Sequence, residues 1–308
     1  MITIWRGSAN QWDCDEMGHM NVRVYLDKAM EGLGAFAVEA EMPHAFQQGT
    51  PSTLMVEDHH VRFLREVLPG RPLTMSACVL EISEAHAVIY QEMIHGDGSV
   101  AAAFRSRVRH AEAKSGKAFP WSNRTRAALE RLMGEAPKAT APRSIDASGP
   151  VRPAAEVTMA AADAVNAPLI GLGAVPADHC DLHGRMQAAW FMGRISDAVP
   201  NLLFDWRKGV AGAAGNGVRM GAAVLEYRLV YRKWPRAGDL IAIRSGLGSA
   251  HEKIHSLVHW ALDPVSGDAW MTSEAVAVTF DLDTRKTLPT PPKSIAALEE
   301  LAPKGLSL

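Results

Sequence analysis

The chain has 308 residues, of which 47% are hydrophobic and 21% are charged, and its formal net charge is −2. This composition is typical of a soluble globular protein with enough apolar material for a large core, and it excludes a mostly disordered chain. The balanced charge gives no overall attraction to nucleic acid or to an anionic surface, so we expect neither as a partner. The length suits either one large domain or two smaller ones.

The first 19 residues, MITIWRGSANQWDCDEMGH, have no basic segment followed by an apolar run, which a secretory signal requires. The least polar long stretch, residues 154–175, contains Glu156 and Asp163, and a charge near the centre of a membrane helix costs roughly 2.5–3.5 kcal/mol. The cysteines are odd in number and lack metal-type spacing, as expected for reduced thiols: Cys14, Cys78 and Cys180. We therefore predict a cytoplasmic protein with no membrane partner.

An internal repeat organises the sequence. Residues 12–33, WDCDEMGHMNVRVYLDKAMEGL, align with residues 178–199, DHCDLHGRMQAAWFMGRISDAV, which places Asp181 at the position of Asp15. Further matches follow in the same order, residues 65–73 with 232–240 and residues 127–132 with 296–301. Because these matches extend over most of the chain, the sequence predicts one structural unit written twice.

The first copy has the pattern of one helix followed by several strands. After Asn21, apolar residues recur at steps of three and four, the spacing of one helix face: Val22, Tyr25, Leu26, Ala29, Met30 and Leu33. Strand-like stretches separated by turn residues then follow at 53–65, 71–82, 86–95 and 99–111. One helix followed by hairpin-connected strands predicts an α+β fold.

The second copy repeats this pattern after a connecting segment. Its helix is expected at residues 186–206, and its strands at 221–233, 239–248, 252–262 and 268–281. The connecting segment contains a short amphipathic helix and then several prolines, a composition that predicts a tether. We divide the chain into a first repeat at 1–113, a linker at 114–153, and a second repeat at 154–308 that ends in a short helix.

The segment from Asp13 to Asn21, DCDEMGHMN, resembles the hallmark of the 4-hydroxybenzoyl-CoA thioesterase-like hotdog family. The closing stretches SRVRHAEAKSGKAFPW and AVTFDLDTRKTLPTPP are also similar to the last strand of that family and its following tail. The resemblance implies a helix wrapped by a curved antiparallel sheet, with two such units joined edge to edge and active sites at their interface. We therefore expect two tandem hotdog repeats that form an intramolecular pseudo-dimer.

The resemblance also implies that Asp15 acts as nucleophile or general base towards the thioester of an acyl-CoA, with Asp181 as its counterpart. Such hydrolysis needs a base or nucleophile and a set of donors for the developing oxyanion. The amides at the helix start, from His19 to Val22, are expected to supply those donors. No cofactor is expected beyond the coenzyme A of the substrate, and no metal.

The remaining residues of the two loops have less specific expectations. His19 orients substrate or water, or it is merely structural. Asn21 holds the water or only caps the helix, and the alternative role for Asp15 is also a helix cap. Arg185 binds a phosphate or carboxylate, or it is simply solvated. The second loop departs from the family pattern, so the first site is expected to matter more. The substrate-binding candidates are Gly18, Met20, Val22, Tyr25, Gly184 and Arg185.

Two further patterns have competing interpretations. The acidic and histidine residues at 178–183 resemble a metal site, but Pro176 and Gly184 favour a loop instead. Arg105, Arg107 and Arg109 alternate, which predicts either a solvent-facing strand or a basic surface for coenzyme A phosphates. The sequence has neither a glycine-rich nucleotide loop nor a Gly-x-Ser-x-Gly turn, which excludes the usual dehydrogenases, kinases and serine hydrolases.

The alternatives to a thioesterase are a hotdog acyl-CoA hydratase or dehydratase and a non-catalytic acyl-CoA-binding protein. The sequence leaves open the acyl group, the choice between coenzyme A and acyl carrier protein, and homo-oligomer formation.

Overall fold

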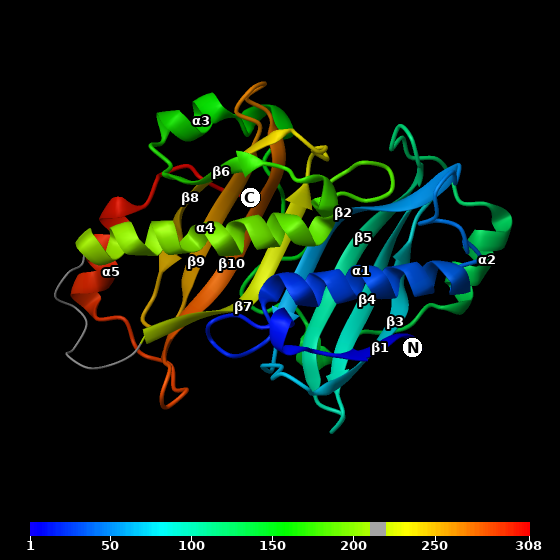
Figure 1. The fold of residues 1–308 in the computed structure, drawn as a ribbon, viewed down its shortest axis with the longest axis horizontal. Helices are drawn as coiled ribbons and strands as arrows, with labels where there is room; N and C mark the ends of the chain where they lie inside the picture. The colour runs from blue at the N-terminus through cyan, green and yellow to red at the C-terminus, as the bar shows by residue number, and fades with distance from the viewer. Residues whose placement is uncertain (210–219) are drawn as a thin grey trace. The chain divides into compact units, whose positions relative to one another are not determined.

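The computed structural model describes residues 1–209 and 220–308, which form two compact units (Figure 1). The first unit consists of Met1–Pro142 and His179–Ala189, and the second of Arg143–Asp178 and Trp190–Leu308. The units therefore divide at Pro142, within the segment predicted as a linker. The loop that contains Asp181 belongs to the first unit, although it lies in the second sequence copy. Among the described residues, no helix is long and apolar enough to span a membrane.

The first unit contains a five-stranded antiparallel sheet with the strand order β1-β3-β4-β5-β2. Its strands are β1 (Ile2–Ser8), β2 (Ser52–Phe63), β3 (Pro72–Ile82), β4 (His86–His95) and β5 (Val100–Glu112). A long helix, α1 (Val22–Glu39), lies across this sheet (Figure 1). A shorter helix, α2 (Asn123–Arg131), follows β5. The helix and the four long strands agree with the elements predicted from the sequence.

Helix α1 is fixed by its apolar face. Leu26, Leu33 and Phe36 are at most 1% exposed, as the spacing of apolar residues predicts. Burying each such side chain contributes roughly 1.5–3 kcal/mol. The side chain of Gln91 on β4 also donates a hydrogen bond to the carbonyl of Ala29, 2.8 Å away. Helix and sheet are thus joined by apolar packing and by a buried polar contact.

The second unit repeats the arrangement with the strand order β7-β10-β9-β8-β6. Its strands are β6 (Leu169–Ala174), β7 (Met220–Tyr231), β8 (Leu240–Ala250), β9 (His255–Leu262) and β10 (Ala269–Asp281). Its helices are α3 (Met159–Ala164), α5 (Pro292–Leu301) and, from Trp190 onwards, α4 (Ala188–Gly209). The order β8-β9-β10-β7 matches β3-β4-β5-β2 of the first unit, and each unit has one long helix. The prediction of tandem hotdog repeats with an α+β fold is therefore confirmed.

The proline-rich segment, which the sequence predicts to be a tether, forms hydrogen bonds within each unit. The part up to Pro142 binds the first unit, and the part from Arg143 binds the second. In the first unit, Arg62 donates to the carbonyl of Ala139 at 3.0 Å, and Arg105 donates to the carbonyl of Thr140 at 2.8 Å. The Thr140 hydroxyl lies 2.8 Å from the buried hydroxyl of Tyr90. Charged side chains of the strands therefore bind the backbone of this segment.

In the second unit, the buried Glu226 on β7 accepts hydrogen bonds from the amides of Arg143 at 2.9 Å and Ser144 at 2.7 Å. Arg228, also on β7, donates to the carbonyls of Asp146 and Gly149, both at 2.9 Å. These bonds supply partners for a carboxylate and a guanidinium that are at most 5% exposed. An unpaired buried charge would cost several kcal/mol, so the segment is part of the unit's structure.

Each unit buries a histidine beside a serine. His59 Nδ1 lies 2.9 Å from Ser106 Oγ in the first unit, and His259 Nδ1 lies 2.6 Å from Ser245 Oγ in the second. Both histidines are 0% exposed, and burial lowers the pKa of each from 6.5 to about 3. Both rings are therefore neutral in the native protein over most of the acidic range.

We predict that the free energy of unfolding falls as the pH drops from about 6.5 towards 3. In this window the unfolded chain protonates both histidines and the native protein does not, so acid favours unfolding by up to about 1.4 kcal/mol per pH unit for each. Urea denaturation at several pH values measures this slope. His59→Gln and His259→Gln should each reduce it, whereas His251→Gln, at an exposed position, should not. An unchanged slope in both buried-site variants would contradict the prediction.

Candidate active site

The loop before α1 is a tight hairpin that presents Asp15. Cys14 and Met20 form an antiparallel bridge, and the Asp15 amide donates to the His19 carbonyl at 3.1 Å. The Gly18 amide donates to the carbonyl of Asp15 at 2.9 Å, and Gly18 has a φ of 79°. This left-handed conformation is strained for residues with a Cβ, which explains the glycine at this position. The hairpin fixes the Asp15 side chain at the start of α1.

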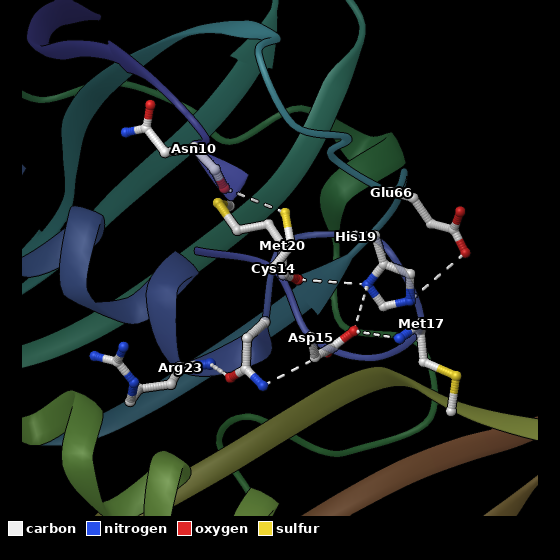
Figure 2. A network of polar contacts seen from close by, with 9 residues as sticks. Asn10, Cys14, Asp15, Met17, His19, Met20, Arg23 and Glu66 are labelled. Atoms are coloured by element: carbon white, nitrogen blue, oxygen red, sulfur yellow. Dashed lines mark hydrogen bonds and ion pairs between the residues drawn. The ribbon is translucent and has the colours of Figure 1, made fainter. Parts of the chain in front are cut away.

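The carboxylate of Asp15 is held by donors and is only 19% exposed (Figure 2). Its Oδ1 accepts a hydrogen bond from the Met17 amide at 3.0 Å, and its Oδ2 accepts one from Asn21 Nδ2 at 3.5 Å. Burial raises the pKa of Asp15 above 3.8, whereas the nearby His19 and the Met17 amide oppose this effect. Asp15 is therefore a partly buried acid and does not project into bulk water.

His19 lies between two carboxylates, as Figure 2 shows. Its Nδ1 is 3.9 Å from Asp15 Oδ1, and its Nε2 is 3.9 Å from Glu66 Oε1. Glu66 follows β2, and the next residue, Val67, accepts a hydrogen bond from the Met20 amide at 2.8 Å. The Glu66 segment is thereby fastened to the Asp15 loop.

Sequence reasoning missed Glu66. Its signal lies in the comparison of the two copies, because residues 65–73 match residues 232–240 and so align Glu66 with Lys233. The first copy therefore pairs a histidine in the loop with a glutamate here, whereas the second has Arg185 and Lys233.

Asn21 caps α1 and also touches Asp15. Its Oδ1 accepts a hydrogen bond from the Arg23 amide at 2.9 Å, which is standard N-capping geometry. Two of the amides expected to meet an oxyanion are occupied, since Met20 donates to Val67 and Asn21 donates to the Asp13 carbonyl at 2.9 Å. The predicted donor array is therefore smaller than expected. In the described part of the chain, the amides of His19 and Val22 have no protein acceptor.

Three residues predicted to bind substrate differ in exposure. Met20 is 1% and Tyr25 is 4% exposed, so both belong to the core, whereas Val22 is half-buried. The Tyr25 ring packs edge-on against Phe63 at a centroid distance of 5.1 Å, and burial raises the pKa of its hydroxyl. Met20 and Tyr25 thus belong to the packed core beside the loop. A role of either residue in substrate binding stays a prediction.

The second loop has the same backbone but a different charge arrangement. Cys180 bridges to Met186, the Asp181 amide donates to the Arg185 carbonyl at 2.7 Å, and Gly184 has a φ of 74°. Asp181 Oδ1 accepts from the Arg185 amide at 3.0 Å, and its Oδ2 accepts from Arg185 Nε at 3.2 Å. Arg185 is only 9% exposed. The interpretation of Arg185 as a solvated residue is therefore wrong, because its guanidinium is ion-paired and buried.

The alternating arginines do not form a uniform solvent-facing row. Arg105 binds the Thr140 carbonyl, whereas Arg107 and Arg109 contact Glu57 at 3.3 Å and 3.1 Å. Among the residues that the structure describes, no group of three or more histidine, cysteine or acidic side chains is arranged to hold a metal ion.

Substitutions of Asn21 should separate its two contacts. Asn21→Ala removes the cap and is expected to lower the free energy of unfolding by about 1 kcal/mol, whereas Asn21→Ser keeps a capping oxygen and changes it little. Both variants remove the amide donor to Asp15 and should raise the pKa of its carboxyl, measured by carboxyl carbon NMR. Ser122→Ala, which removes the cap of α2, is the control that lowers stability without moving this pKa. An Asp15 pKa that is unchanged in Asn21→Ser would contradict the assignment of the contact.

Comparison with solved structures identifies proteins of the same fold. An acyl-ACP thioesterase from Bacteroides thetaiotaomicron is 12% identical, with a TM-score of 0.63 over 89% of this chain and 96% of that chain. A Lactobacillus plantarum protein described as an oleoyl thioesterase is 11% identical, with a TM-score of 0.66 over 92% and 96%. A 12:0-ACP thioesterase from Umbellularia californica is 9% identical, with a TM-score of 0.65 over 90% and 93%. At these identities the likeness concerns the fold alone.

A search of curated proteins finds no significant match to the sequence. A model of the Thioesterase-like superfamily, however, matches two segments, residues 9–129 and 175–298. Each segment begins before one acidic loop and continues through the long helix and strands of that copy. Because the two segments make up most of the chain, the protein belongs to the Thioesterase-like superfamily, and both of its repeats are matched.

Proposed function

We propose that the protein hydrolyses the thioester bond of an acyl-CoA to a free acid and coenzyme A, with Asp15 as the catalytic carboxylate. Membership of the Thioesterase-like superfamily supports the reaction class. The observation that carries the assignment of Asp15 is its position: a partly buried carboxylate at the start of a long helix, beside His19 and Asn21.

The reaction needs one proton acceptor and one oxyanion site. As a general base, Asp15 takes a proton from water while the water oxygen attacks the carbonyl carbon, after which the carbon–sulfur bond breaks and the thiolate is protonated. As a nucleophile, Asp15 displaces the thiolate itself, and water then hydrolyses the resulting anhydride. In both routes the amide of His19 or Val22 is available to stabilise the oxyanion. A raised pKa suits Asp15 for the role of base, because its carboxylate then binds a proton more readily.

The two loops are proposed to differ in role. In the first loop, His19 is flanked by Asp15 and Glu66, which positions its ring beside the reacting carboxylate. In the second, Asp181 is ion-paired with Arg185, so its carboxylate is less available as a base. We therefore assign the chemistry to the first loop. The structural neighbours named as ACP thioesterases make acyl carrier protein the alternative acyl donor.

Asp15→Asn should reduce kcat/KM for acyl-CoA hydrolysis by about 10²- to 10⁴-fold, because it removes the proton acceptor or nucleophile. Free thiol release is measured with short, branched, aromatic and hydroxylated acyl-CoAs and with the matching acyl carrier proteins. Glu16→Gln removes an exposed acidic group from the same loop and serves as the matched control at neutral pH, above the acidic limb of the profile. Asp181→Asn should have a far smaller effect than Asp15→Asn.

Three outcomes would decide against this assignment. Full activity in a folded Asp15→Asn variant would exclude Asp15 as the catalytic group. Saturable acyl-CoA binding without turnover would favour a non-catalytic acyl-CoA-binding protein. Addition of water to an enoyl-CoA, with no thiol released, would favour a hydratase.

The pH dependence of kcat/KM should also report on Asp15. Its carboxylate is the active form, so activity is expected to fall as the pH drops through its pKa, which burial places above 3.8. The negative charge of Glu16 contributes to that raised pKa. Glu16→Gln should therefore move the acidic limb of the profile to lower pH, and a limb that moves to higher pH would contradict the assignment.

A further inference from the structure

Arg185 is a buried cation with few strong acceptors. Its Nε donates to Asp181 Oδ2 at 3.2 Å, but among the described residues its Nη1 meets only the thioether sulfur of Met55, also at 3.2 Å. A guanidinium group has five N–H donors, and a thioether is a weak acceptor. At 9% exposure, only a small part of Arg185 reaches solvent. The part of the guanidinium group that faces Met55 is therefore suited to an additional hydrogen-bond acceptor.

A second arginine approaches the same sulfur atom. Arg109 Nη2 lies 3.9 Å from Met55 Sδ, and Met55 and Arg109 are paired residues of β2 and β5. Arg109 Nη1 is held by Glu57 at 3.1 Å, whereas its Nε is buried and has no hydrogen-bond partner in the described part of the chain. Two guanidinium groups thus converge on one thioether sulfur, and among the residues that the structure describes Arg109 Nε has no acceptor.

Gly116 packs closely against this cluster. A Cβ on Gly116 would lie 3.1 Å from Met55 Sδ and 3.6 Å from Arg109 Nη2, and Gly116 has a φ of 72°. A side chain here would press on both the sulfur and the guanidinium. The backbone of Gly116 therefore lies directly beside the Met55 thioether, with no side chain between them.

The charge of the cluster selects the kind of ligand. Arg107, Arg109 and Arg185 face two carboxylates, Glu57 and Asp181, which leaves one net positive charge. Glu57 also contacts His86 Nε2 at 3.4 Å. A singly charged carboxylate balances this excess, and its two oxygens match the forked donors of arginine. A doubly charged phosphate would leave an excess of negative charge.

We propose that Arg185 and Arg109 bind the carboxylate of a small organic acid beside Met55. Arg185 occupies the position that His19 has in the first copy, so the second loop is a carboxylate-binding site where the first contains the catalytic candidate. The assignment does not depend on thioester hydrolysis and is tested without turnover.

The test is a calorimetric titration of the full-length protein with sodium acetate and with sodium hexanoate at constant ionic strength. Saturable binding is expected in the wild type, and Arg185→Gln and Arg109→Gln should each weaken it at least tenfold. Arg185→Lys keeps the positive charge but loses the paired N–H donors of the guanidinium group. Its Kd should therefore stay higher than that of the wild type. Arg126→Gln, which removes an exposed arginine of α2, is the matched control and should leave the Kd unchanged.

Because Arg185→Gln leaves Asp181 without its partner, the double variant Asp181→Asn/Arg185→Gln tests the same site with both charges removed. The double variant should also lose binding. The proposal is overturned if the wild type shows no saturable binding, if the double variant and Arg109→Gln bind as the wild type does, or if inorganic phosphate binds more tightly than hexanoate.

Discussion

The contact between the Asp15 carboxylate and the start of α1 is the interaction on which the candidate chemistry depends. Hydrogen bonds from Met17 and Asn21 hold the two oxygens, and burial raises the pKa of the acid. The position of the helix is set in turn by residues such as Leu33, which is 1% exposed against the sheet. The packing of the apolar core thus determines the position of the partly buried Asp15 carboxylate.

Duplication has preserved the backbone of this loop and changed its electrostatics. Gly18 and Gly184 have nearly the same φ, and both hairpins are closed by equivalent hydrogen bonds. His19, however, lies between two carboxylates, whereas Arg185 neutralises Asp181 directly. One backbone therefore supports two different sites, since a hairpin of this type places few demands on the side chain that follows its glycine.

The sequence predicts whatever follows from local pattern. Apolar spacing identifies α1, alternation and turn residues identify the strands, and the repeat identifies Asp15 with Asp181. The contacts of Glu66 with His19 and the burial of Arg185 against Met55 were beyond prediction, because each depends on segments far apart in the chain. For the same reason, the use of the Met20 amide by Val67 was not foreseen.

The backbone around Pro142 has a consequence for any attempt to separate the repeats. Cleavage of the peptide bond between Pro142 and Arg143 would replace the Arg143 amide with an ammonium group beside Glu226, a carboxylate that is 1% exposed. The charge balance and the geometry at this buried carboxylate would both change, because an amide donates in one fixed direction and an ammonium group is strongly hydrated. A proteolytic cut at this proline would therefore disturb the fragment that starts at Arg143 through its new terminus.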